Sequence, residues 1–320
     1  MKKLTIFLAL IMVFGLLPLS APAQAAPPVR VWGLIGPTGM SLAPLMAEQD
    51  PAYEYQLAAA PEELVGTVVS GNYDIAALPT NLAAVLYQKT KGQLQMLAIN
   101  TLGVLYVLEK GESLQSLEDL SGKTLTLSGQ GAVPEYVINF VLKASGIVDA
   151  KLDYKSEHNE VSTLAASGLA NIVMLPQPMV TALMLKDPSF RIALDITQEF
   201  SKAAELSGLG DAILSMGCLV VRSEFAKEQP EALARFMELY EASVDYVNEQ
   251  PELAARDIVA AGILPSEVIA EKAIPLSNIV YIAGDEMKPL LDPFFEILFK
   301  ANPASVGGAL PDDHFYYRAE

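Results

Sequence analysis

The chain has 320 residues, which is enough for two lobes with separate cores. Its net charge is −17, with 38 acidic residues against 21 basic ones, so it repels nucleic-acid phosphates and anionic lipid surfaces. Two histidines and one cysteine are too few for a histidine and cysteine metal cluster or an internal disulfide. No nucleic-acid partner, metal or other cofactor is therefore expected.

The first 25 residues have the pattern of a secretory signal peptide. Two lysines precede an apolar run over residues 4–19, and small residues at 23–25 end it in the order Ala-Gln-Ala. The alternative is a membrane anchor, but the run is short for a span of about 20 residues. No cysteine lies near the cleavage site, so a lipoprotein anchor is not expected. We predict a periplasmic or secreted protein, whose net charge becomes −19 when the two lysines are lost.

The stretch Gly36-Pro37-Thr38-Gly39-Met40-Ser41 is predicted to be a turn from a strand to a helix. It follows an apolar run at 29–35 and precedes apolar residues at helical spacing. Glycine allows a positive φ and lets a ligand approach the main chain. Thr38 and Ser41 can cap a helix start, where free N–H groups favour negative charge on a ligand. Taken alone, this stretch is equally well explained as an ordinary turn.

Three later turns repeat this arrangement, each after an apolar strand. They are Pro79-Thr80-Asn81, Ser128-Gly129-Gln130-Gly131 and Pro176-Gln177-Pro178, after the strands 73–78, 124–127 and 172–175. Further strands are predicted at 94–99, 104–108, 151–154, 190–194 and 219–221, and helices at 61–70, 82–88, 116–120, 134–144, 159–167 and 181–185. From residue 230 onward the pattern is helical, over 231–248, 253–261, 265–273 and 289–299.

The alternation of strands and helices predicts an α/β protein with mostly parallel sheets. In open α/β sheets, ligands bind at the carboxyl ends of the strands. The four turns lie in those positions and would surround one cleft. Cys218 lies in an apolar run and is expected to be a buried small hydrophobe.

The residues give no sign of catalysis. His158 lies in a polar segment and is expected in a solvated loop. Gly122-Lys123-Thr124 is similar to part of a phosphate-binding loop, but Leu117 stands where that motif needs glycine and a strand follows instead of a helix.

Several stretches together resemble one family. They are residues 36–39, 73–81, 116–127, 129–131 with 134–136, 175–178 and 218–222. In this order they resemble periplasmic solute-binding proteins of ABC transporters, of the type II group that covers nitrate, sulfonate/taurine and thiamine-pyrimidine binding proteins. Gln177 departs from the family, which usually has Glu between the two prolines. The cleft is then less suited to a positively charged group.

The resemblance implies the two-lobed type II periplasmic binding protein fold, each lobe a mostly parallel sheet flanked by helices. Residues 26–103 and 218–320 would form lobe 1 and residues 104–217 lobe 2, with crossovers near 101–105 and 215–219. The protein would be a monomer that closes around its ligand by a hinge motion and delivers it to an ABC permease in the membrane. The turns and the resemblance together predict these ligand-binding residues: Gly36, Pro37, Thr38, Gly39, Met40, Thr80, Asn81, Thr101, Gly129, Gln130, Gly131, Tyr136 and Gln177.

The ligand follows from the charges of the turns, which contain no lysine, arginine or histidine. Trp32, Tyr106 and Tyr136 lie at or near the predicted cleft and either stack on a flat ligand or pack in the core. We expect a small, polar, neutral organic molecule such as a heteroaromatic vitamin precursor, with an organic sulfonate as the alternative. Two other functions stay open: an enzyme on the same fold, of the lyase or pyrimidine-forming type, and a sensor or chaperone-like module that presents ligand to a receptor.

Overall fold

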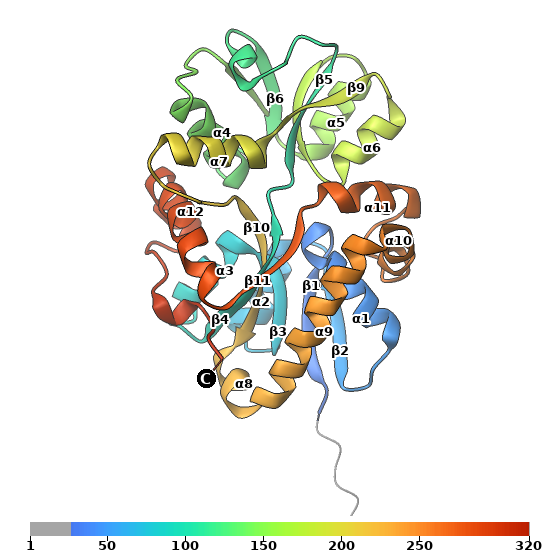
Figure 1. Ribbon diagram of the computed structural model, residues 1–320, viewed down its shortest axis with the longest axis vertical. Coiled ribbons are helices and arrows are strands. Elements are labelled where there is room, and N and C mark those ends of the chain that lie inside the picture. Colours follow the sequence, from blue (N-terminus) through green and yellow to red (C-terminus); the bar gives the residue numbers. More distant parts are fainter. Residues whose placement is uncertain (1–26, 320) are drawn as a thin grey trace, which may run out of the picture.

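The computed structural model describes residues 27–319, which fold around two β-sheets flanked by helices (Figure 1). The predicted signal peptide lies outside these residues. The strands of the first sheet come from residues 29–102 and 215–283, and those of the second sheet from residues 105–195. None of the helices between residues 27 and 319 is long and apolar enough to cross a membrane.

The first sheet has the strand order β11-β4-β10-β3-β1-β2. Its strands are β1 (Val29–Leu34), β2 (Tyr53–Ala58), β3 (Ile75–Pro79), β4 (Leu94–Leu102), β10 (Ser215–Arg222) and β11 (Ile279–Ala283). β1 is parallel to β2 and to β3, whereas β10 is antiparallel to both of its neighbours. Strands β3 and β10 are almost wholly buried, as their continuous apolar sequences predict.

The second sheet has the strand order β7-β6-β8-β5-β9. Its strands are β5 (Leu105–Lys110), β6 (Thr124–Ser128), β7 (Lys151–Lys155), β8 (Ile172–Pro176) and β9 (Phe190–Asp195). β6 is parallel to β7 and β8, but β5 is antiparallel to β8 and β9. Both sheets are thus mixed rather than mostly parallel. The difference arises because β5, β10 and β11 run opposite to the other strands of their sheets, and β5 and β10 each follow a crossover.

The helices cover the two sheets. The α-helices are α1 (Ala43–Glu48), α2 (Pro61–Val69), α3 (Thr80–Lys89), α4 (Val133–Ala144), α5 (His158–Ala166), α6 (Met179–Lys186), α7 (Ile196–Leu206), α8 (Ser223–Glu228), α9 (Pro230–Glu249), α10 (Pro251–Ala260), α11 (Glu267–Ala273) and α12 (Met287–Ala301). Short 3₁₀ helices are η1 (Pro37–Leu42), η2 (Leu117–Leu120), η3 (Ile274–Leu276), η4 (Gly284–Glu286), η5 (Pro303–Val306) and η6 (Asp313–Phe315). Proline in the first turn of α2, α4 and α9 marks their starts, as expected where its missing N–H costs nothing.

Apart from short 3₁₀ helices, four elements have no counterpart among those predicted from the sequence: β2, α7, α8 and β11. β11 is a half-exposed edge strand with an irregular register against β4. α7 begins at its cap Asp195, whose carboxylate accepts hydrogen bonds from the N–H groups of Thr197 and Gln198. Its apolar face is buried through Phe200 and two alanines, so the helix is held by packing more than by its local sequence.

Two segments connect the sheets. Gly103 and Val104 join β4 to β5, and residues 207–214 lead back from α7 to β10. The stretch 215–219, expected as the second crossover, therefore lies inside β10. Two further contacts link the two parts of the molecule, since α12 packs against α4 and α11 packs against α6 (Figure 1).

Candidate ligand-binding site

The carboxyl ends of the parallel strands in the two sheets lie at edges that face each other. In the first sheet, Gly217 of β10 lies opposite both Pro79 at the end of β3 and Thr101 near the end of β4. In the second sheet, the start of β5 lies opposite Pro176 at the end of β8. Because only two residues separate β4 from β5, the edge after β4 adjoins the edge where β5 begins. The predicted turns thus fall on facing edges, which is the position where α/β sheets bind ligands.

Thr38 belongs to a buried polar group at the edge of the first sheet. Its carbonyl oxygen accepts a hydrogen bond of 3.0 Å from Nδ2 of Asn100, which also donates to the Tyr240 hydroxyl at 2.9 Å. The Thr101 hydroxyl donates to Oδ1 of Asn100 at 3.0 Å. A Cβ at Gly217 would lie 2.6 Å from that Oδ1 and 2.7 Å from Oγ1 of Thr38. Only glycine at this position leaves room for the group.

The turn after β3 is held by segments from far along the chain. Oγ of Thr80 and Oγ of Ser215 lie 2.7 Å apart, and both residues are buried. Asn81 donates from Nδ2 to the carbonyl oxygen of Ser305, at 3.4 Å. The side chains in this turn therefore position the start of α3 against β10 and η5.

Gln177 brings an unpaired donor to the edge of the second sheet. It follows β8, after Pro176, and only 2% of its surface is exposed. Its Oε1 accepts a hydrogen bond of 2.8 Å from the Thr181 hydroxyl, and its backbone N–H bonds to the Val104 carbonyl. Its Nε2 has no hydrogen-bond partner. A buried amide donor left unpaired lowers the free energy of unfolding by about 1–3 kcal/mol. A bound molecule that supplies an acceptor to this donor would remove that cost.

The structure corrects the expectation that His158 lies in a solvated loop. His158 begins α5, three residues after the last residue of the strand β7, and its Nδ1 lies 2.5 Å from Oγ of the buried Ser128. Burial lowers the pKa of His158 below its ordinary value of 6.5, so the ring is neutral near pH 7. The edge of the second sheet therefore carries a titratable group that the sequence had not indicated.

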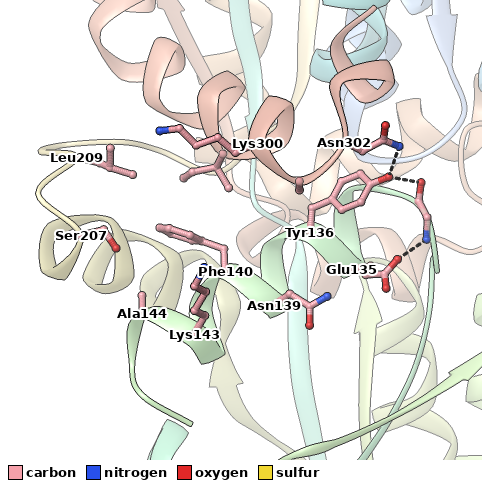
Figure 2. A pocket seen from close by; sticks show the side chains of 13 residues that line it. Glu135, Tyr136, Asn139, Phe140, Lys143, Ala144, Ser207, Leu209, Lys300 and Asn302 are labelled. Carbon is pink, nitrogen blue, oxygen red and sulfur yellow. Dashed lines mark hydrogen bonds between the residues drawn. The ribbon is translucent and has the colours of Figure 1, made fainter. Parts of the chain in front are cut away.

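The turn 129–131 is fixed through Tyr136 (Figure 2). The Tyr136 hydroxyl donates to the carbonyl oxygen of Gly131 at 2.7 Å and accepts a 2.8 Å hydrogen bond from Nδ2 of Asn302. Glu135 accepts from the Gly131 N–H at 2.5 Å. Gly129 and Gly131 have positive φ angles, which glycine adopts without strain, and Gln130 between them is exposed. Asn302, which follows α12, thus holds a predicted ligand turn of the second sheet.

The first turn departs from the expected capping. Neither η1, which begins after Gly36, nor α1 has a side-chain cap, so Thr38 and Ser41 do not cap these helices. Gly39 is required for another reason, because a Cβ there would lie 2.2 Å from the carbonyl oxygen of Leu34. Pro37 occupies the first position of η1, and Met40 is fully buried in the core cluster beside the first sheet.

The three aromatic residues predicted at or near the cleft, Trp32, Tyr106 and Tyr136, have different surroundings. Tyr106 is buried, and its hydroxyl donates to the Leu276 carbonyl oxygen at 2.8 Å, which connects the second sheet to the segment before β11. Trp32 is half-buried and packs against the main core cluster. Tyr136 is buried to 9% exposure and belongs to the same cluster. Core packing therefore accounts for much of the surface of each ring.

Buried charges lie at the opposite edges of the sheets. Asp74, just before β3, pairs with Arg30 and Arg222, each at 2.9 Å. Burial raises the pKa of Asp74, but hydrogen bonds from both arginines outweigh this and hold it below its ordinary value. Glu109, at the far end of β5, pairs with Arg191 at 2.9 Å. The buried polar side chains at the facing edges, in contrast, are hydroxyl and amide groups.

The sequence-predicted residues thus gather in separate small groups. Thr38 and Thr101 share the Asn100 group, Thr80 meets Ser215, and Gly131 meets Tyr136. Sequence reasoning did not find the roles of Ser215, His158 and Asn302, whose partners lie between 30 and 166 residues away along the chain. Asn100 was within reach, because it directly precedes Thr101 at the end of a predicted strand.

The fold and its facing sheet edges define the type II periplasmic binding protein architecture. An ABC transporter protein from Parabacteroides distasonis is 22% identical, with a TM-score of 0.78, over 92% of this chain and 100% of that chain. The aliphatic sulphonate binding protein SsuA from Escherichia coli is 14% identical, with a TM-score of 0.69, over 92% and 94%. SsuA from Xanthomonas axonopodis pv. citri, bound to MOPS, is also 14% identical, with a TM-score of 0.58, over 91% and 96%.

The family follows from the sequence. The model of the family described as NMT1/THI5 like matches residues 88–254, more than half of the chain. The protein belongs to this NMT1/THI5-like family. No curated protein matches the chain.

Proposed function

We propose that this protein is the extracytoplasmic solute-binding component of an ABC import system. It captures a small polar organic molecule between the facing sheet edges and delivers it to a membrane permease. The proposed lobes are residues 26–103 with 218–320 and residues 104–217, joined by the crossovers, except that residues 215–217 belong to β10 of the first sheet. Support comes from the family, from solved structures of the same fold that are named as ABC transporter and sulfonate-binding proteins, and from the neutral polar groups at the edges.

The observation that carries this proposal is the unpaired Nε2 of Gln177. This donor is buried at one of the two facing edges, and the folded protein alone leaves it without an acceptor. A ligand that supplies an oxygen or ring nitrogen removes this cost. Binding energy of this kind also gives specificity, because a molecule without the acceptor leaves the amide unsatisfied.

A neutral ligand fits the charges best. The buried ion pairs of Asp74 and Glu109 lie at the far edges, and His158 is neutral near pH 7 because burial lowers its pKa. The hydroxyl and amide groups at the facing edges are uncharged, so they can hydrogen-bond a neutral ring without any charge on the ligand. We therefore favour a heteroaromatic molecule such as a vitamin precursor. An organic sulfonate is the second candidate, because two similar structures are named as sulfonate-binding proteins.

The molecule that co-purifies with the protein tests this function. Native mass spectrometry of gently purified protein should show one bound small molecule, whose mass matches a neutral ring compound. Calorimetric titration with a pyrimidine, taurine and nitrate then compares the classes directly. Binding of taurine or nitrate alone would contradict the neutral ligand, and chemical turnover of the bound molecule would favour the enzyme on this fold.

Replacement of Gln177 by leucine tests the site itself. Gln177→Leu removes the amide at similar volume, so the affinity for the co-purified molecule should fall about 10-fold or more. The melting temperature of the ligand-free protein should change little, because removal of the unpaired donor offsets loss of the hydrogen bond that Oε1 accepts from the Thr181 hydroxyl. Gln88→Leu is the matched control, since the Gln88 amide donates to the carbonyl oxygens of Ala309 and Leu310 at the surface. Equal effects of both variants on affinity would contradict the proposed site.

A further inference from the structure

A cavity opens between the helices α4 and α12, and Gly131, Tyr136 and Asn302, which fix the turn 129–131, also line it (Figure 2). Its volume is about 880 Å³, within the range of about 300–1,000 Å³ that is typical of small-molecule sites. One wall comes from α4, the opposite wall from the end of α12, and the third from the segment after α7. The cavity therefore lies beside the second crossover, where residues 207–214 lead back to the first sheet.

The two helices present matching faces to this cavity. Tyr136, Phe140 and Lys143 lie three and four residues apart on α4 and so share one side of the helix. On α12, Ile297 and Lys300 have the same spacing. Each face thus carries an apolar side chain that lines the cavity and a lysine in the last turn of its helix.

The charges at the cavity differ from those of the whole protein. The chain has a net charge of −17, but two lysines and one glutamate line this cavity. The carboxylate of Glu135 is already bound to the Gly131 N–H and lies beyond Tyr136 in Figure 2, away from both lysines. Lys300 pairs at 3.0 Å with Glu296, but 69% of the lysine side chain and 45% of the glutamate side chain are exposed, so solvent weakens this pair.

We propose that this cavity binds a small amphipathic anion at its lysine-bearing end, away from the turn 129–131 that it shares with the cleft between the sheet edges. The apolar body of the ligand packs on Phe140 and Ile297, and its carboxylate or sulfonate head lies between Lys143 and Lys300. Ser207 at the third wall adds a neutral hydrogen-bonding group. A neutral molecule of the same length gains the apolar contacts but not the two charge interactions.

Octanoate is the probe for this site, and octanamide is its neutral equivalent. Calorimetric titration of the purified full-length protein should show octanoate binding about 10-fold more tightly than octanamide. The double variant Lys143→Gln/Lys300→Gln should lose this difference. The matched control Lys89→Gln/Lys186→Gln removes the same charge at exposed positions of α3 and α6 and should leave octanoate binding unchanged.

A second variant separates this site from the cleft. Ala301→Trp places a large ring at the exposed end of α12 inside the cavity and should abolish octanoate binding, while the co-purified molecule still binds. Equal affinities for octanoate and octanamide, or equal effects of the two lysine pairs, would overturn the proposal. So would displacement of the co-purified molecule by octanoate, because octanoate would then occupy the cleft. If Gln177→Leu did not weaken binding of the co-purified molecule, the proposed cleft site would be wrong, but the results with octanoate would be unaffected.

Discussion

Single residues at the facing edges are neutral, and one of them is a histidine whose neutrality depends on burial. His158 lies 2.5 Å from Ser128, and its pKa is lowered because the folded protein removes the ring from water. The unfolded chain has no such burial, and its histidine titrates near the ordinary value of 6.5. This difference couples the edge of the second sheet to pH.

The sign of this coupling gives a prediction. Above pH 6.5 the ring is mostly neutral in both the folded and the unfolded state. Below pH 6.5 the unfolded chain binds a proton more readily than the folded protein, because burial lowers the pKa of His158 in the folded state. The free energy of unfolding should therefore fall from pH 7.5 to pH 5.5, and less so in His158→Gln. Urea unfolding at the two pH values measures this. His314→Gln, at an exposed position, is the control, and an identical pH dependence in both variants would show that His158 does not contribute.

Among the elements, β10 does the most to position the first edge. It lies between β3 and β4, carries Gly217 against the Asn100 group and brings Ser215 to Thr80. The close approach of Thr38 and Asn100 depends on the missing side chain at Gly217. β10 thus acts on the candidate site by shape as well as by its hydrogen bonds.

Gly217→Ala should therefore damage both stability and binding. The new Cβ would come within 2.6 Å of Asn100 Oδ1, and such overpacking costs about 1–3 kcal/mol. Gly66→Ala is the matched control, because a Cβ there meets nothing within 4 Å on the exposed side of α2. That control should stabilise the helix by about 0.5–1 kcal/mol. Thermal unfolding and ligand titration compare Gly217→Ala with Gly66→Ala. Similar melting temperatures of the two variants would be inconsistent with a tightly packed Asn100 group.

In the molecule as a whole, contacts between the two groups of strands lie on several sides of the crossovers. Tyr136 meets Asn302, Tyr106 meets Leu276, and Asn278 donates from Nδ2 to the Gly103 carbonyl oxygen. The last of these holds the first crossover itself. Hinge closure around a ligand would change the contact between Tyr136 and Asn302 more than the contact between Asn278 and Gly103, because Gly103 belongs to the crossover itself.

The proposed closure can be measured as a distance. Spin labels at Val148→Cys and Leu253→Cys, one exposed position on each proposed lobe, should move closer when the co-purified ligand is added. Cys218 does not interfere, because it is fully buried and burial raises the pKa of its thiol. Labels at Val148→Cys and Leu169→Cys, both within residues 104–217, should keep their distance. An unchanged distance in the first pair would argue against a hinge.

Much of the secondary structure is encoded locally. The apolar runs of β1, β3 and β8, the proline starts of α2 and α4, and the polar turns between them are visible in the sequence because strand and helix patterns repeat within a few residues. Cys218 was expected to be buried, and it is. The family was also recognisable, because its matching stretches are spread over the chain in order.

Tertiary structure alone decided how these elements combine. No local pattern shows that β5 and β10 run against their neighbours, since strand direction depends on the path of the chain through both crossovers. The amphipathic α7 and the edge strand β11 exist through packing against distant surfaces. The same holds for His158, which tertiary folding places beside Ser128. A residue's neighbours in space, rather than in sequence, set the burial that keeps this ring neutral and leaves Nε2 of Gln177 without a partner.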